Sequence, residues 1–115
     1  MSSRGDREFL NDILEAIHRA DMYVAGMSYV EFLADLKTQD AVIRTLEIIG
    51  EATKRLSSEL CTHHPAVPWK NMAGLRDKLI HDYFGVNFDI VWQIVHDELP
   101  SVAIQVEQIL VGNVA

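Results

Sequence analysis

Arginine, histidine and tyrosine side chains occur close together within residues 74–85, at the positions Arg76, His81 and Tyr83. Histidine exchanges protons near neutral pH, so His81 could act as a general acid or base. Arginine stays charged, and its planar fork matches two phosphate oxygens. Together they could promote attack of a ribose 2′-hydroxyl on the adjacent phosphorus, because a fixed cation stabilises the negative charge that develops. This chemistry predicts RNA rather than DNA as the substrate and calls for no metal or cofactor.

The spacing of these residues limits how they could meet. At 100° per residue, Arg76 and Tyr83 fall on nearly one face of a straight helix. His81 lies about 140° around from Arg76 and shares a face with Asp77, which could orient the imidazole. The length of the arginine side chain, an irregular helix end near Gly85 or a second protomer could each close this gap.

Apolar residues at helical spacing predict the elements that must hold these side chains. Two long stripes follow steps of four and three residues. Their members are Phe9, Ile13, Ile17, Ala20 and Val24, and then Val42, Leu46, Ile49, Thr53 and Leu56.

The residues between these two stripes predict a stop and a short helix. Gly26 should end the first long helix. Ser28 and Glu31 have the spacing of a capping box, which predicts a short helix through Leu36. Thr38 is the predicted N-cap of the second long helix.

The second half of the chain predicts two further helices. Ser57 and Ser58 should cap a short turn, and prolines then mark a loop over residues 63–68. A third helix should begin near Pro68 or Trp69, with a break near Gly74, and run to residue 83 or 84. The fourth should contain Pro100, which is expected to kink or split it. Its stripe is Val91, Ile94, Val95, Leu99, Val102, Val106 and Ile109. We therefore expect one all-α domain over residues 1–115, an up-and-down bundle of four to five helices with short extra turns.

Charge and cysteine content limit the function classes. The chain has 10 Lys and Arg against 17 Asp and Glu, for a net charge of −7, which argues against a nonspecific nucleic-acid binder. However, residues 44–81 carry +2, whereas residues 1–43 carry −4 and residues 82–115 carry −5. Cys61 is the only cysteine, which predicts a reducing compartment. With no apolar run of membrane-spanning length, we expect a cytoplasmic protein.

The pattern Arg-x4-His-x-Tyr resembles the signature of HEPN-domain ribonucleases, and the trailing tyrosine resembles the HepT subgroup. Further blocks that look like those of this family occur in the same order along most of the chain. They are residues 12–16, 38–44, 46–52, 68–69 and 89–92.

The resemblance implies the toxin of a HepT-type toxin–antitoxin system, a metal-independent endoribonuclease. Arg76 and His81 would be the catalytic pair, supported by Asp77 and Tyr83. Tyr83 would contact RNA or accept AMP from a cognate minimal nucleotidyltransferase antitoxin, which would silence the toxin. The resemblance also implies a homodimer whose cleft lies across the twofold axis. RNA is the expected substrate, with tRNA among the candidates.

Other interpretations stay open. The chain could be a non-catalytic HEPN dimer that serves as a binding scaffold for a nucleotidyltransferase, or a purely structural helical dimer. Glu51 is expected in an exposed ion pair with Lys54 or Arg55. Trp69 and Trp92 are expected in the core or in a dimer interface. No metal site is expected at residues 63–64, because no ligand lies nearby at suitable spacing.

Overall fold

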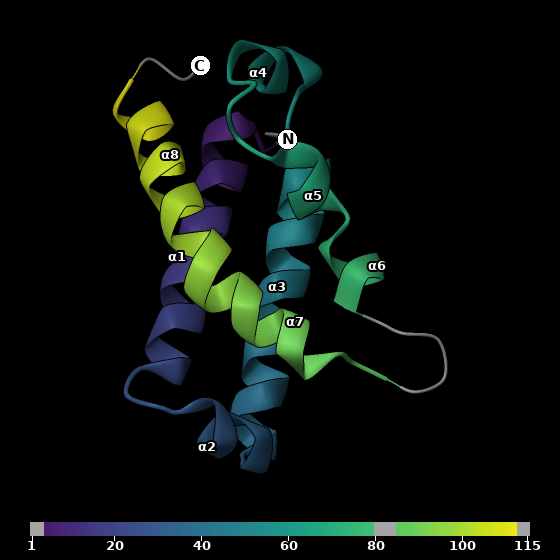
Figure 1. Cartoon of the computed structure of the whole chain (residues 1–115). Coiled ribbons are helices and arrows are strands. Elements are labelled where there is room, and N and C mark those ends of the chain that lie inside the picture. Colours follow the sequence, from purple (N-terminus) through teal and green to yellow (C-terminus); the bar gives the residue numbers. More distant parts are fainter. Residues whose placement is uncertain (1–3, 80–84, 113–115) are drawn as a thin grey trace.

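A computed structural model describes residues 4–79 and 85–112, and these residues form an all-α structure, as predicted (Figure 1). Helix α1 (Asp6–Val24) descends and α3 (Leu36–Lys54) returns alongside it. The last described elements are α7 (Phe88–Gln93), a π-helical turn (Ile94–Glu98) and α8 (Leu99–Val111). Helix α8 packs against α1. These segments make the predicted up-and-down bundle.

Four short helices complete the described part of the chain. Helix α2 (Tyr29–Ala34) lies at the turn between α1 and α3, and α4 (Ser58–His63) follows α3. Helices α5 (Trp69–Ala73) and α6 (Leu75–Leu79) both pack on α3. The break predicted near Gly74 is confirmed, because Gly74 separates these two helices.

The core is built from the predicted stripes. Every member of the second and fourth stripes is buried, and in the first stripe only Phe9 is partly exposed. Burial of a large aliphatic side chain contributes about 1.5–3 kcal/mol. The helical period alone therefore identified most of the residues that stabilise the bundle.

The turn between α1 and α3 confirms one prediction and corrects another. Gly26 adopts φ 75°, which glycine tolerates without strain. The capping box also forms: the Ser28 hydroxyl accepts from the N–H of Glu31 at 3.1 Å, and the Glu31 carboxylate accepts from the N–H of Ser28 at 2.9 Å. The predicted N-cap Thr38 is wrong, because Asp35 caps α3 and accepts from the N–H of Thr38 at 3.0 Å.

Leu36 consequently belongs to α3 and not to the preceding short helix. Asp35 is extended, with φ −112° and ψ 92°, and this conformation ends α2 after Ala34. The buried side-chain amide of Gln39 then donates to the carbonyls of Phe32 and Leu33, both at 2.9 Å. Both carbonyls lie in the last turn of α2, and that of Phe32 also accepts from the N–H of Asp35 at 3.2 Å.

Pro100 has the predicted effect on the last helix. Proline has no N–H to donate, and its ring collides with the carbonyl four residues before it. The chain accommodates this with the π-helical turn, in which the N–H of Leu99 donates to the carbonyl of Ile94, five residues back. Pro100 then lies in the first turn of α8, where a missing N–H costs nothing.

Candidate functional site

Helix α6 holds Arg76 and Asp77 on the surface of the bundle. Leu75 and Leu79 are buried and four residues apart, so they fix one face of α6 against the core. The three residues between them, Arg76, Asp77 and Lys78, are exposed. Arg76 is thus available to an anion while its backbone is held on both sides.

The seat of α6 depends on Gly50 in α3. A Cβ atom at Gly50 would lie 3.4 Å from the carbonyl oxygen of Met72, 3.7 Å from that of Ala73 and 3.9 Å from the Cβ of Leu75. Glycine therefore lets the end of α5 and the start of α6 approach the backbone of α3. The packing of these helices is therefore close at Gly50.

The two other predicted site residues, His81 and Tyr83, lie outside the described residues, as does the predicted helix end at residue 83 or 84. The ends that flank them are joined: the N–H of Asn87 donates to the carbonyl of Leu79 at 3.1 Å. The Asn87 side chain then caps α7 by accepting from the N–H of Ile90 at 3.2 Å. The structure therefore places Arg76 and Asp77 on the exposed surface of α6, and it fixes the two described positions, Leu79 and Asn87, that flank His81 and Tyr83.

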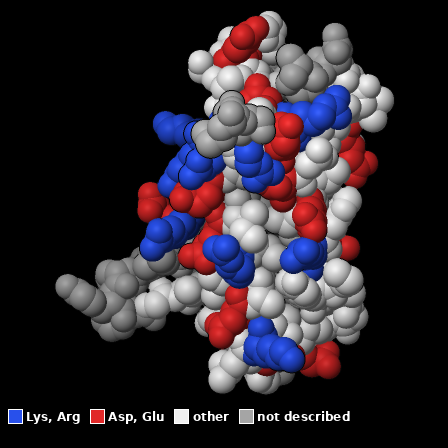
Figure 2. Space-filling model, turned by 180° about the vertical axis from the view of Figure 1, so that it is seen from behind, with Lys and Arg blue, Asp and Glu red and all other residues white. Residues whose placement is uncertain are grey.

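Charges of both signs cover the face formed by α1 and α3, where blue and red side chains alternate in Figure 2. Glu51 in α3 pairs with Lys54, with 3.3 Å between Oε2 and Nζ, which confirms the predicted exposed ion pair. Such a pair contributes only tenths of a kcal/mol, about 0.3–0.5. On a surface with charges of both signs, attraction of a polyanion depends on local clusters of cations. Helices α5 and α6 together carry three cations, Lys70, Arg76 and Lys78.

The two tryptophans pack against the core and are partly buried. Trp69 Nε1 donates to the carbonyl of His64 at 2.9 Å, which ties the start of α5 to the preceding loop. The ring of Trp92 lies 5.3 Å from that of Phe32 and 3.9 Å from the exposed ring of His96. Both tryptophans thus stabilise the bundle in the way predicted for core aromatics.

Cys61 is half-buried, and desolvation together with the nearby Asp6 carboxylate raises the pKa of its thiol. A raised pKa leaves little reactive thiolate at neutral pH.

Within residues 4–79 and 85–112, no helix is long and apolar enough to cross a bilayer. In the same ranges, no cluster of three or more His, Cys, Asp or Glu could hold a metal ion.

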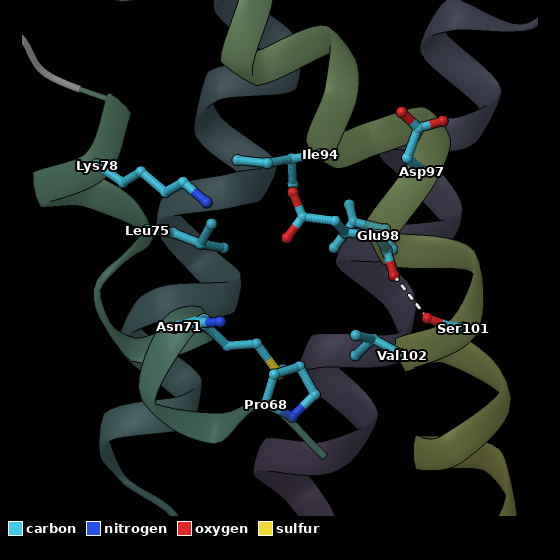
Figure 3. Close-up of a pocket in the computed structure, with 11 residues that line it drawn as sticks. Pro68, Asn71, Leu75, Lys78, Ile94, Asp97, Glu98, Ser101 and Val102 are labelled. Atoms are coloured by element: carbon cyan, nitrogen blue, oxygen red, sulfur yellow. Dashed lines mark hydrogen bonds between the residues drawn. The ribbon is translucent and has the colours of Figure 1, made fainter. Parts of the chain in front are cut away.

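A cavity beside α6 was not predicted. It has a volume of about 180 Å³ and lies between α5 and α6 on one side and the π-helical turn and α8 on the other (Figure 3). Its polar lining includes Lys78 and Glu98, which are far apart in the sequence, so no spacing rule could join them. The only sequence signal was Pro100, which disturbs the helix that presents Glu98.

Comparison with known families gives a match to "Ribonuclease HepT-like" over residues 13–109. The chain belongs to this HepT-like family. A candidate RNase of Methanocaldococcus jannaschii is 48% identical over 110 residues, which cover 96% of this chain and 91% of the relative. The "Probable ribonuclease HepT" of Thermococcus cleftensis is 46% identical over 98 residues, covering 85% of this chain and 89% of the relative.

A third relative, a candidate RNase of Caldanaerobacter subterraneus, is 45% identical over 104 residues, covering 90% of this chain and 93% of its own length. No solved structure matched this chain significantly. The family match and the helical bundle confirm the resemblance found in the sequence.

Proposed function

We propose that this protein is a metal-independent endoribonuclease and the toxin of a HepT-type toxin–antitoxin pair. The observation that carries the proposal is the exposed Arg76–Asp77 pair, fixed on α6 between two buried leucines, in a chain of the ribonuclease HepT-like family. The buried leucines fix the backbone that carries this guanidinium, and fixed charge that faces the developing negative charge is the largest contribution in many enzymes.

In the proposed reaction the ribose 2′-oxygen forms a bond to phosphorus and the bond from phosphorus to the 5′-oxygen breaks. His81 either takes the proton of the 2′-hydroxyl or protonates the leaving 5′-oxygen, and water carries the other of these two protons, so that the reaction consumes none. Arg76 stabilises the phosphorane, and Asp77 orients the imidazole. The products are a 2′,3′-cyclic phosphate and a 5′-hydroxyl, so no external reactant is consumed.

Regulation completes the proposal. A cognate minimal nucleotidyltransferase, the antitoxin, transfers AMP to the hydroxyl of Tyr83. The added phosphate brings negative charge and bulk beside the catalytic pair, and it repels the RNA backbone. The active form is a cytoplasmic homodimer in which a second protomer helps to bring Arg76 and His81 to one phosphate.

The decisive test is RNA cleavage in the presence of EDTA. The wild-type protein should cleave RNA, and His81→Ala should reduce the rate at least about 100-fold, the usual contribution of a general acid or base. His63→Ala is the matched control, because His63 is exposed on α4, away from α6. Circular dichroism should show the same helix content in all three proteins.

The non-catalytic scaffold makes the opposite prediction. If RNA survives with the wild-type protein while the nucleotidyltransferase binds equally well to Arg76→Ala and His81→Ala variants, the enzymatic proposal is wrong. Cleavage that EDTA abolishes would contradict metal independence alone.

A further inference from the structure

The cavity beside α6 combines apolar walls with a few polar groups at its mouth. Leu75 comes from α6, Ile94 from the π-helical turn and Val102 from α8, and they supply apolar surface. Asn71 and Lys78 contribute an amide and an ammonium group from one side, and Glu98 contributes a carboxylate from the other. Apolar walls with a few placed polar groups are typical of small-ligand sites.

The side chains of Lys78 and Glu98 extend toward one another across this cavity (Figure 3). The ion pairs found in the described part of the chain do not include one between them. The ammonium group of Lys78 and the carboxylate of Glu98 therefore face the same space without forming an ion pair with each other. The side chain of Asp97 points away from this space (Figure 3).

The π-helical backbone around Glu98 directs its side chain toward the cavity. Glu98 ends the π-helical turn that Pro100 induces, and its carbonyl accepts from the Ser101 hydroxyl at 3.0 Å. A regular α-helix would have a narrower turn and would place this side chain at a different angle. Such π-helical insertions occur frequently at functional sites.

We propose that this cavity binds one guanine base of single-stranded RNA, a specificity that rests on the proposed function in taking RNA as the ligand. The two oxygens of the Glu98 carboxylate accept from two neighbouring donors, and the guanine edge offers such a pair in its N1–H and N2–H groups. Lys78 donates to the adjacent O6, a pairing that amino groups commonly make. Adenine, cytosine and uracil lack this pair of adjacent donors next to an acceptor.

The size of the cavity supports a base and not a whole nucleotide. The volume of about 180 Å³ lies below the roughly 300–1,000 Å³ of pockets that enclose a whole drug-sized ligand, so one planar base suits this space better than a nucleotide. The ribose and phosphate then remain outside. Lys70 and Arg76, the other exposed cations of α5 and α6, do not line the cavity and stay available to the RNA backbone.

Binding to a short 2′-O-methyl oligouridylate with one central guanine tests the proposal, because this probe cannot be cleaved. Fluorescence anisotropy should show about tenfold tighter binding of guanine than of inosine, which lacks the N2 amino group; one good bidentate pair gives this discrimination. Glu98→Gln should remove the difference, because its amide nitrogen cannot accept from guanine. Glu107→Gln, which removes a carboxylate of α8 that does not line the cavity, should keep the difference.

Equal affinity for guanine and inosine, or a guanine preference that survives in Glu98→Gln, would overturn the proposal. Tighter binding of free GMP than of the oligonucleotide would assign the cavity to a nucleotide and would also overturn it. None of these binding measurements requires cleavage. A protein that prefers guanine but leaves ordinary RNA intact would therefore contradict the proposed nuclease activity and still support the guanine site.

Discussion

Arg76 and Tyr83 make different demands on the fold. Arg76 is anchored in α6, where two buried leucines set its backbone, so its position is a property of the bundle. The proposed role of Tyr83 depends on its hydroxyl, which must be reached by another enzyme. The role of Arg76 is therefore tested by removing its charge, and the role of Tyr83 is tested by removing its hydroxyl oxygen.

Tyr83→Phe should separate catalysis from neutralisation. The variant keeps the ring but cannot accept AMP, so RNA cleavage should stay within about tenfold of wild type, the loss of at most one ordinary hydrogen bond. Incubation with the nucleotidyltransferase and ATP should silence the wild-type protein and leave the variant active. Intact-mass measurement should show an added AMP group on the wild-type protein only.

If the variant still gains AMP, another hydroxyl is the acceptor. Tyr23→Phe provides the control, since Tyr23 lies at the end of α1, away from α6.

At the scale of elements, the contact of α3 with α5 and α6 controls the position of Arg76. Gly50→Leu should force these elements apart, because the added side chain meets the Met72 and Ala73 carbonyls. Overpacking of this kind costs about 1–3 kcal/mol. Urea unfolding should show this loss, and RNA cleavage by the folded variant should fall.

Gly50→Ala is the control. Its single methyl group would sit at 3.4 Å from the Met72 carbonyl oxygen, close to ordinary contact, and alanine favours helix by up to about 1 kcal/mol. Stability should thus change little or rise. If Gly50→Leu were as stable and active as Gly50→Ala, the close approach of α6 would not matter.

The cap of α3 gives the fold a pH dependence. The hydrogen bond from the N–H of Thr38 to the Asp35 carboxylate lowers the pKa of Asp35. A lowered folded-state pKa stabilises the protein above the unfolded value of about 4 and loses this effect as the pH falls through the folded value. Asp35→Asn keeps an acceptor without a charge, so its unfolding free energy should fall less than that of wild type between neutral pH and about pH 3.

Urea unfolding at each pH gives these free energies. An equal fall in the unfolding free energy of wild type and Asp35→Asn across this pH range would contradict this role of Asp35. Asp40→Asn serves as the charge control, because Asp40 is exposed one turn further along α3.

Much of the fold could be predicted from the sequence, since it depends on local periodicity and caps. The stripes, Gly26, the Ser28 capping box and the effect of Pro100 all follow from short-range rules. Thr38 was a wrong choice because Asp35 also precedes the stripe, and only the extended backbone at Asp35 decides between them. The cavity could not be predicted, because only tertiary packing brings Lys78 and Glu98 to the lining of one cavity.

At the scale of the whole molecule, the site is expected to need two chains. On one straight helix Arg76 and His81 diverge by about 140°, so a composite site can form when one protomer supplies the guanidinium and its partner the imidazole. Arg76→Ala and His81→Ala proteins, each inactive alone, should then regain activity when unfolded and refolded together. With random pairing, about a quarter of the sites are intact in a twofold dimer.

Sedimentation should show a dimer in every sample, and the mixture should recover on the order of that fraction of wild-type cleavage. A mixture as inactive as its components would mean that each site draws both side chains from one chain.

The hydrogen bond from Asn87 to the Leu79 carbonyl has a consequence for how the protein can diversify. Leu79 is buried in the core, and this bond holds Asn87 beside it, so the scaffold itself fixes the two described positions on either side of His81 and Tyr83. Substitutions at His81 or Tyr83 can therefore remove or restore chemistry across lineages without rebuilding the contacts that hold these two positions.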